Sequence, residues 1–504
     1  MAVVGSGIAG LAAAWELTGA AAGPVPGTPS VVVVEEADAV GGKLATAAFA
    51  GQPVDVGPDG FLGRRPEALE LCRELGLTAD LAPVGLSGAA VWARGRRRPL
   101  PDGLYLGLPT RLLPVARSGI LSPAGVLRLA GDVVAPRPDR RGPLGDRAIG
   151  PLVARKLGTQ VVDRLVEPML GGIYAGGVSD ASAAAVLPAL LEASQRGASL
   201  MRGLRQVSRA TAPVPGGGAP APADDAEAAP AFWALRPGFA TLATRLREAL
   251  EARGTQVRTG CRVEALQRAG DGWVLRTRGG TLAADGVVLA LPADAASELL
   301  APHDADAATL LRAVEYASLA VVTMLVDEAA LPDVLYGTGL LVPRGTVVAG
   351  LADDGSGAGP ACLVTACTYL WAKWPHVSRH DGLLLRVSVG RYGDERFAAL
   401  DDERLVARVA RELSTLLDLR APPLDALVTR WPAALPQYRV HHVLRVAGVE
   451  AAAKRLGRLG VAGAAYRGVG IPACIASGRA AARLVMDELG CARAPETRGA
   501  AVAP

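Results

Sequence analysis

Aromatic residues and lysine are scarce in this chain of 504 residues. Phe, Trp and Tyr together make up 4% of it, and the formal net charge is +4. So small a charge on so long a chain argues against nucleic acid as a partner. The basic residues are almost all arginine, because lysine occurs only at Lys43, Lys156, Lys373 and Lys454.

Paired cysteines are also missing. The six cysteines form no C-x-x-C motif, and Cys362 and Cys367 have no histidine or second cysteine pair nearby that would complete a zinc site. We therefore predict no metal centre, and expect reduced, mostly buried thiols of a cytoplasmic protein. The cysteines are Cys72, Cys261, Cys362, Cys367, Cys474 and Cys491.

Long apolar runs are absent as well. No stretch approaches the roughly 18 apolar residues of a membrane-spanning helix, so we expect a soluble protein and leave peripheral membrane contact open. The apolar residues 1–17 lack the basic start of a signal peptide. They are better interpreted as the first strand and helix of the fold.

The opening of the chain has the pattern of a βαβ unit. Residues 2–4 and 30–34 are short β-branched runs, and residues 9–22 between them have a helical pattern. This order predicts a parallel sheet and an α/β fold. Because the length exceeds one ordinary core, we expect more than one lobe.

Further along, the pattern changes several times. Helices broken by Pro and Gly are expected at 148–157 and 160–166, within a helical region that ends near residue 210. A Pro/Ala/Gly/Asp tract at 211–231 has no apolar period and is predicted to be a disordered insertion. Later elements are expected at 256–258, 261–268, 273–277, 286–290 and 458–462 as strands, at 472–489 as a helix, and at 317–392 as mixed strands and loops.

The first βαβ unit carries a G-x-G-x-x-G motif at Gly5, Gly7 and Gly10. Gly5 permits the tight turn, Gly7 lets the backbone approach a pyrophosphate, and Gly10 lets helix and strand pack closely. The start of the helix adds N–H groups and a partial positive charge for the phosphates. The sequence therefore predicts a dinucleotide site.

The second strand ends in an acidic pair, Glu35 and Glu36. A carboxylate there accepts hydrogen bonds from ribose hydroxyls, and we favour Glu35; the alternative is a solvated strand end. Gly41, Gly42 and Lys43 complete the pattern E-x5-GG. This arrangement indicates FAD rather than NAD, because the glycines let the chain pass close to the longer cofactor.

Two more segments fit the same cofactor. Residues 55–60, Asp-Val-Gly-Pro-Asp-Gly, form a turn sequence that could pass the flavin or be a plain turn. Residues 463–472 are rich in glycine and place Pro472 at the start of the last helix. Aimed at the N1–C2=O edge, that helix end would stabilise reduced flavin; the alternative is a simple helix cap.

Over nearly its whole length the chain resembles the flavin-dependent protoporphyrinogen and coproporphyrinogen oxidase family. The blocks that carry the resemblance are DVGPDGFLGRRPEALELCRELGL (55–77), GLPT (107–110), EPMLGGIYAGGVSD (167–180), TACTYLWAKWPH (365–376), TRWPAALPQY (429–438) and YRGVGIPACIASGRAA (466–481). The blocks at 167 and 466 are specific to porphyrinogen oxidases. GLPT and TRWPAALPQY resemble the coproporphyrinogen-oxidising, Gram-positive branch, which is usually soluble.

The resemblance implies a Rossmann-like FAD-binding domain of the amine-oxidase type, built from discontinuous segments, with a mixed α+β substrate domain and a helical lobe. The expected FAD-binding parts are residues 1–90, 232–300 and 441–490, the helical/substrate lobe is 91–210, the substrate domain is 301–440, and a disordered tail is 491–504. Carried over by position, the FAD-binding residues are Gly5, Ser6, Gly7, Ile8, Ala9, Gly10, Glu35, Glu36, Gly42, Lys43, Gly57, Pro58, Asp59, Gly60, Val263, Trp431, Val469, Gly470 and Ile471.

The chain also departs from the family pattern. Ala39 stands where arginine is usual, Ala473 where aspartate is usual, and His441 where glycine is usual. These changes affect the details of the expected flavin contacts and not the cofactor itself.

The implied reaction is the six-electron oxidation of coproporphyrinogen III to coproporphyrin III in heme biosynthesis, with oxygen as acceptor. A substrate with four propionates needs cationic groups beside an apolar wall, for which we select Arg64 and Arg65, with Tyr174 and Gly172 lining the ring pocket. A solvated surface arginine is the alternative for Arg65. No catalytic dyad is predicted.

Other interpretations stay open at this point. They are a protoporphyrinogen IX oxidase, an amine-oxidase-like flavoenzyme acting on a polyamine or carotenoid, and a non-catalytic flavin- or porphyrin-binding protein. The arginines at 94 and 96–98 form a solvated turn, or meet acidic lipid or a partner such as the downstream ferrochelatase.

Overall fold

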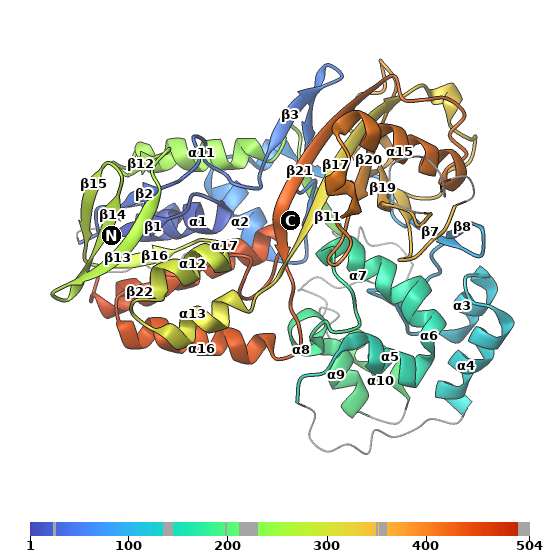
Figure 1. Cartoon of the computed structure of the whole chain (residues 1–504), viewed down its shortest axis with the longest axis horizontal. Coiled ribbons are helices and arrows are strands. Elements are labelled where there is room, and N and C mark those ends of the chain that lie inside the picture. The colour runs from blue at the N-terminus through green and yellow to red at the C-terminus, as the bar shows by residue number, and fades with distance from the viewer. Residues whose placement is uncertain are drawn as a thin grey trace, which may run out of the picture.

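The computed structural model describes residues 1–23, 27–134, 145–196, 199–210, 230–348, 351 and 360–491. The predictions of a disordered insertion at 211–231 and a disordered tail at 491–504 lie outside these residues, except for residues 230, 231 and 491. The described chain forms two sheet-containing lobes and a helical lobe, and β17 and β21 run from the first lobe into the second (Figure 1).

The first lobe contains a five-stranded parallel sheet in the order β12-β2-β1-β16-β22. Its apolar strands are buried on both faces, as parallel sheets require. Val3, Val33 and Val288 face helices α1 and α17, whereas the alternate residues face a small antiparallel sheet and α12. The strands are β1 (Ala2–Val4), β2 (Val32–Val34), β12 (Gln256–Arg258), β16 (Val287–Leu289) and β22 (Leu459–Val461). The predicted βαβ unit and the later strands and helix are thereby confirmed.

The layers around this sheet come from four separate stretches of the chain. The helices are α1 (Ile8–Leu17), α2 (Pro66–Glu74), α11 (Ala240–Glu251), α12 (Ala293–Leu300), α13 (Ala305–Arg312), α16 (His442–Leu456) and α17 (Ile471–Glu488). The small sheet consists of β13 (Val263–Ala269), β14 (Gly272–Thr277) and β15 (Gly280–Ala284). Leu311 and Val314 pack in the core of this lobe, so the predicted boundary at residue 300 is too early.

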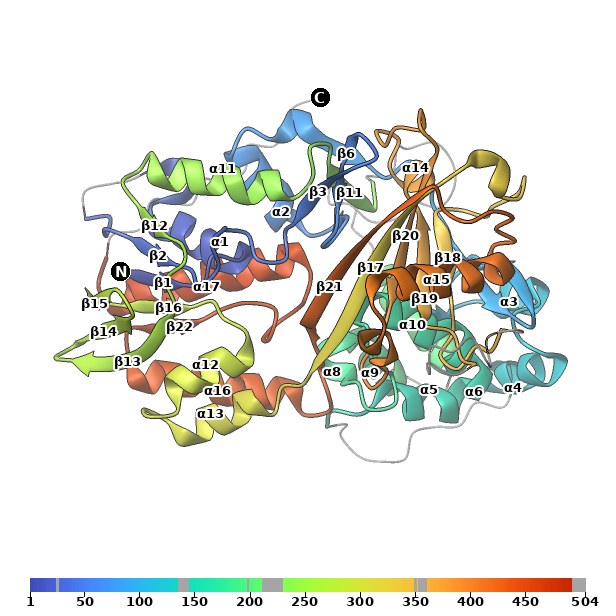
Figure 2. The same cartoon turned by 45° about the horizontal axis from the view of Figure 1, so that its top comes forward.

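The second lobe is a seven-stranded sheet in the order β21-β17-β20-β19-β18-β7-β8, with α15 covering one face (Figure 2). The strands are β7 (Ala90–Ala93), β8 (Arg96–Pro99), β17 (Tyr316–Val326), β18 (Gly339–Leu341), β19 (Val364–Tyr369), β20 (Leu383–Val389) and β21 (Asp425–Pro436), and the helices are α14 (Leu370–Lys373) and α15 (Asp402–Leu416). Because β7 and β8 pair into this sheet, residues 91–99, the start of the predicted helical/substrate lobe, lie in the second lobe.

The helical lobe has its own apolar core. Its helices are α3 (Leu112–Ser118), α4 (Pro123–Val134), α5 (Ile149–Leu157), α6 (Thr159–Val161), α7 (Glu167–Tyr174), α8 (Ala183–Val186), α9 (Pro188–Gln195) and α10 (Leu200–Ala210). Residues Val162–Val166 form a π-helical turn before Pro168. Proline cannot donate a backbone hydrogen bond, and a locally widened helix accommodates that loss.

Short strands complete the fold. They are β3 (Thr46–Phe49), β4 (Gln52–Asp55), β5 (Phe61–Leu62), β6 (Leu81–Pro83), β9 (Leu104–Tyr105), β10 (Leu108–Pro109) and β11 (Phe232–Leu235). Across the described residues, no helix has both the length and the apolar character needed to cross a membrane.

Candidate functional site

The glycine turn between β1 and α1 is built for a close approach. Gly5 has φ +97°, and a Cβ there would lie 2.5 Å from the Ala290 carbonyl oxygen. A Cβ on Gly10 would lie 1.9 Å from the Gly5 carbonyl oxygen. At Gly7, which begins α1, a Cβ would meet nothing within 4 Å. The turn is therefore closed on its protein side and open beside Gly7, as a pyrophosphate site requires.

Glu35 fixes this turn to the end of β2. One of its carboxylate oxygens accepts hydrogen bonds from the Ser6 backbone N–H at 2.6 Å and from the Ser6 hydroxyl at 2.8 Å. The other oxygen accepts the Ala37 N–H at 2.9 Å. Glu36 instead points outward and pairs with Arg262 at 3.1 Å on the surface. Of the two predicted carboxylates, the structure thus places Glu35 at the turn.

The strand that follows Cys261 lies beside the same strand end. The Cys261 N–H donates to the Glu35 carbonyl at 2.7 Å, and this brings Val263 near the end of β2. Val263 is buried and its pairing with β14 is irregular there. Its predicted role, a backbone contact with the adenine, is compatible with this position.

Gly41 and Gly42 bring the next segment onto the turn. The Gly41 N–H donates to the Ser6 carbonyl at 2.9 Å, and a Cβ on Gly42, where φ is +57°, would lie 3.5 Å from the Gly7 Cα. Residues 55–60 then run alongside, since a Cβ on Gly57 would lie 1.9 Å from the Lys43 carbonyl oxygen. Segments predicted separately, at Lys43 and at Gly57–Gly60, therefore form one surface with the glycine turn.

The second lobe holds this segment by three side chains. Lys373 Nζ contacts the Asp59 carboxylate at 2.8 Å, Arg386 donates to the Gly57 carbonyl, and the Trp431 indole N–H donates to the Val56 carbonyl at 2.8 Å. Burial alone would raise the pKa of Asp59, but Lys373 and Arg386 outweigh it and hold this pKa below its usual range. Trp431 and the Asp59 side chain thus position the backbone at Gly57 and Pro58.

The C-terminal loop leads into α17 next to α1. Gly470 caps α17 with extended backbone, Pro472 lies in the first turn, and no side chain caps the helix within the described chain. The two helices touch closely, because a Cβ on Gly478 would lie 2.0 Å from the Ala9 carbonyl oxygen. The middle of α17 therefore packs against the first turn of α1, whose N-terminus carries the glycine turn.

The structure places the three residues that depart from the family pattern, His441, Ala473 and Ala39, in different surroundings. His441 adopts φ +72°, the left-handed region where glycine is favoured, which explains why glycine is usual at that position. Ala473 is buried, and its Cβ would lie 2.7 Å from a Cβ added to Gly468. Ala39 is exposed on the loop after β2.

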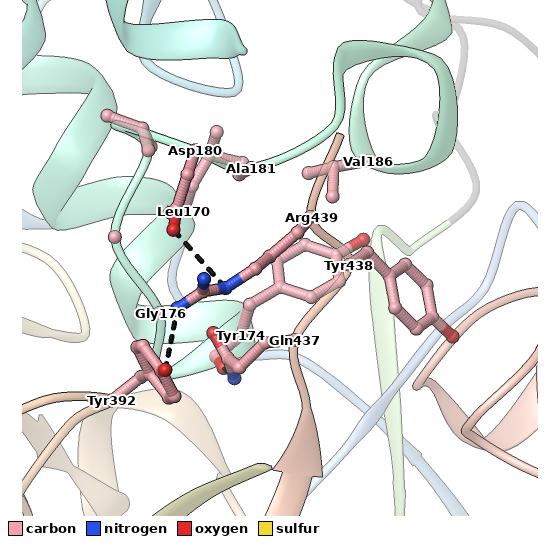
Figure 3. A pocket seen from close by; sticks show the side chains of 12 residues that line it. Leu170, Tyr174, Gly176, Asp180, Ala181, Val186, Tyr392, Gln437, Tyr438 and Arg439 are labelled. Carbon is pink, nitrogen blue, oxygen red and sulfur yellow. Dashed lines mark hydrogen bonds and ion pairs between the residues drawn. The ribbon is translucent and has the colours of Figure 1, made fainter. Parts of the chain in front are cut away.

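A narrow pocket of about 20 Å³ lies where the helical lobe meets the end of β21 (Figure 3). Tyr174 and Tyr438 line it, with ring centroids 6.1 Å apart. A Cβ on Gly176 would lie 2.0 Å from Gln437 Oε1, so the glycines after α7 allow close packing. Arg439 bridges the lobes here by pairing with Asp180 and Glu315 and by donating to the Tyr392 hydroxyl at 2.6 Å.

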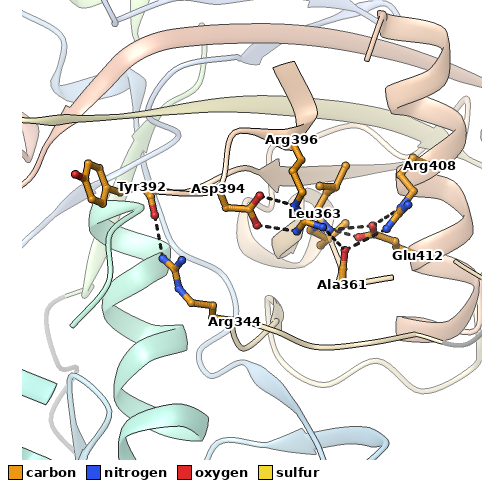
Figure 4. Close-up of polar contacts among 9 residues, drawn as sticks. Arg344, Ala361, Leu363, Tyr392, Asp394, Arg396, Arg408 and Glu412 are labelled. Carbon is orange, nitrogen blue, oxygen red and sulfur yellow. Dashed lines mark hydrogen bonds and ion pairs between the residues drawn. The ribbon is translucent and has the colours of Figure 1, made fainter. Parts of the chain in front are cut away.

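Glu167 begins the block that resembles porphyrinogen oxidases, and it is buried. Its carboxylate accepts the Val178 N–H at 2.9 Å and pairs with Arg344 at 3.2 Å. The Arg344 guanidinium is 41% exposed and also donates to the Tyr392 carbonyl (Figure 4). Gly172 lies close by, with a Cβ position 3.5 Å from Leu341.

Arg64 and Arg65 precede α2. Arg64 is exposed, whereas Arg65 pairs with Glu67 at 2.7 Å and its side chain is 42% exposed. No contact joins either residue to Tyr174 in the described structure, so the two halves of the predicted substrate site are not brought together directly. Sequence reasoning missed Arg344, Lys373, Arg386 and Tyr438; Lys373 and Tyr438 lie inside quoted blocks and offered a signal, whereas Arg344 and Arg386 did not.

Clusters of metal-ligating side chains or thiols of low pKa would mark other classes of site. No group of three or more His, Cys, Asp or Glu residues in the described ranges could hold a metal ion. The cysteines are free thiols, as expected, and burial raises the pKa of Cys72 and Cys362 to about 12. Cys72 and Cys362 are therefore not thiolate nucleophiles.

The fold and the site together define a flavin-dependent oxidoreductase with two sheet-containing lobes and a helical lobe. The chain belongs to the flavin containing amine oxidoreductase family, whose pattern it matches over residues 8–486. It is 36% identical to a coproporphyrinogen III oxidase of Mycobacterium bovis and 31% identical to one of Bacillus subtilis, covering 95–96% of this chain and 96% of each relative. It is also similar to a crystal structure titled as a protoporphyrinogen oxidase of Exiguobacterium sp. 255-15, with a TM-score of 0.81, 29% identity and coverage of 97% of this chain and 98% of that one.

Proposed function

We propose that the chain is an FAD-dependent coproporphyrinogen III oxidase that uses oxygen. The observation that carries this proposal is the meeting of the porphyrinogen-specific block at 167–180 with the loop at 463–470 through Tyr438. Full-length similarity to enzymes named coproporphyrinogen III oxidase supports the same substrate. The name of the Exiguobacterium protein makes protoporphyrinogen IX the second candidate substrate.

The residues at the glycine turn fit FAD rather than a mononucleotide. Gly5–Gly10 with the N-terminus of α1 would hold the pyrophosphate, Glu35 the ribose, and Val263 the adenine. Lys43 and residues 57–60 would pass the flavin ring, and Val469–Ile471 would face its N1–C2=O edge. When bound, the flavin supplies two-electron oxidation and passes the electrons to oxygen.

The protein itself would bind and orient the porphyrinogen. Its propionates need cationic partners, and the half-exposed guanidiniums of Arg65 and Arg344 meet that need. Tyr174 and the glycines after α7 would form the wall against the flat ring. Pyrrole N–H protons can leave as the ring becomes aromatic, so no protein base is assigned.

The balance of the reaction gives a direct test. Conversion of coproporphyrinogen III to coproporphyrin III removes six electrons and six protons, which three oxygen molecules take up as three hydrogen peroxide molecules. We expect extraction of the purified protein to release FAD and not FMN, and the coupled assay to give three peroxides for each coproporphyrin. A different ratio, or release of FMN, would contradict the proposal.

We further propose a cytoplasmic location and a downstream ferrochelatase as a partner that receives the porphyrin. The arginine-rich strand β8 could serve as the contact, although Arg97 already pairs with Asp418 at 2.7 Å. Co-purification of a ferrochelatase with the wild-type protein, lost when Arg94 and Arg96 are replaced by alanine, would support this contact.

A further inference from the structure

Tyr438 lies where three parts of the chain meet. It follows β21, is 4% exposed, and has its ring between Tyr174 and His442. The His442 ring stacks on it with a centroid distance of 3.9 Å and an angle of 15° between planes. His442 in turn contacts the Tyr466 carbonyl through Nε2 at 2.9 Å.

The Tyr438 hydroxyl makes two hydrogen bonds to the loop at 463–470. It donates to the Ala464 carbonyl and accepts the Gly468 N–H at 2.8 Å. Burial raises the pKa of Tyr438, so the hydroxyl keeps the proton that it donates. A phenylalanine would leave both backbone groups without this partner.

The backbone of the same residue is tied to the helical lobe. The Ser182 N–H donates to the Tyr438 carbonyl at 2.7 Å, and the Gln437 amide donates to the Tyr174 carbonyl at 3.0 Å. Figure 3 shows Tyr174, Gln437 and Tyr438 side by side in the pocket wall. If the pocket wall at Tyr174 moved, residues 437 and 438 would therefore move with it. Through the Tyr438 hydroxyl, the loop at 463–470 would move as well.

We infer that Tyr438 is a positioning residue that connects the substrate-side wall at Tyr174 to the loop that sets the N-terminus of α17. This inference rests on the proposed FAD site, because the N–H groups at the start of α17 would stabilise the negative charge of reduced flavin. It does not depend on which porphyrinogen is the substrate.

The test is the flavin reduction equilibrium of the Tyr438→Phe holoenzyme, measured against a reference dye without substrate. Loss of the hydroxyl should move the equilibrium toward oxidised flavin by about three- to tenfold, the effect of misplacing a hydrogen-bonded donor. Under turnover, kcat should fall by a similar factor while KM changes by less than about twofold, since ring packing is kept.

Tyr392→Phe is the matched control. The Tyr392 hydroxyl lines the same pocket, but its hydrogen bonds go to Glu315 and Arg439 and not to the loop at 463–470. In Tyr392→Phe the flavin reduction equilibrium measured against the dye should therefore stay at the wild-type value. Gly468→Ala would also displace the loop at 463–470, because the added Cβ would lie 2.7 Å from the Ala473 Cβ. If Tyr438→Phe does not fold, Gly468→Ala should show the same change toward oxidised flavin. An unchanged equilibrium in Tyr438→Phe, or in Gly468→Ala where it serves as substitute, would overturn the inference whatever the substrate proves to be.

Discussion

At the residue scale, the two candidate propionate contacts are both half-exposed arginines. Arg65→Ala should raise the KM for coproporphyrinogen III about five- to tenfold, because a charge-assisted hydrogen bond at such a site contributes around 1 kcal/mol. FAD should stay bound, since Arg65 is not part of the glycine turn. Steady-state kinetics on the FAD-loaded variant provides the check.

Arg73→Ala is the control for Arg65, because Arg73 is exposed on the same helix. Its kinetics should match those of the wild type. If Arg65→Ala behaved in the same way as Arg73→Ala, Arg65 would be an ordinary surface residue paired with Glu67.

The buried Asp55 carboxyl group makes the free energy of unfolding of the protein depend on pH. Burial raises its pKa to about 6, although the Thr46 hydroxyl and the Phe239 N–H oppose this. The folded protein therefore favours protonated Asp55. Its full stability is present below pH 3.8, the pKa of Asp55 in the unfolded chain, and part of that stability is lost as the pH rises through about 6, its pKa in the folded protein. Asp55→Asn should therefore gain stability over the wild type between pH 4 and pH 7, by up to about 3 kcal/mol.

Thermal melts of the two proteins across this pH range measure the effect. Asp333→Asn, a change at an exposed carboxylate, should leave the pH dependence of the melting temperature as it is in the wild type. A constant difference between Asp55→Asn and the wild type at every pH would contradict the assignment.

At the element scale, α15 is joined to the second lobe by Glu412, which also forms a buried ion pair with Arg408 of the same helix (Figure 4). Arg408 and Glu412 lie one turn apart with 1% and 0% of their side chains exposed. Glu412 also accepts the N–H groups of Leu363 and Val364 at 2.9 Å, so it anchors the strand β19. Replacing it leaves a buried guanidinium without its carboxylate.

Glu412→Gln should cost about 3–5 kcal/mol of stability for this reason. Glu403→Gln, on the exposed start of the same helix, should cost less than about 1 kcal/mol. Chemical denaturation measures the free energy of unfolding of both variants. Similar small losses in both would mean that Glu412 does not hold α15 in place.

The elements themselves were largely predictable, because each depends on a local pattern. The β-branched run before Gly5 and the E-x5-GG spacing fixed the first sheet strands and the turn between them. The boundary at residue 300 was placed too early, and the strands at residues 90–99 were not predicted, because α13 and β7 pack against partners far away in the sequence. No local pattern encodes such partners.

At the scale of the whole molecule, the candidate site is held together by contacts between residues that are far apart in the sequence. Asp59 and Lys373 are 314 residues apart, and Trp431 bonds Val56 across 375 residues. A single sequence places Trp431 at the cofactor only through a family resemblance, and it could not show that the indole N–H donates to the Val56 carbonyl. The meeting of the segments around the glycine turn was therefore more predictable than the arrangement of the residues around Tyr174.

The most direct test of the proposed oxidase is aerobic turnover of the FAD-loaded protein on coproporphyrinogen III and protoporphyrinogen IX side by side. Porphyrin fluorescence above the autoxidation blank reports the rate. We predict faster formation of coproporphyrin than of protoporphyrin. A preference for protoporphyrinogen IX would contradict the substrate assigned here, and no turnover of either with FAD bound would contradict the oxidase itself.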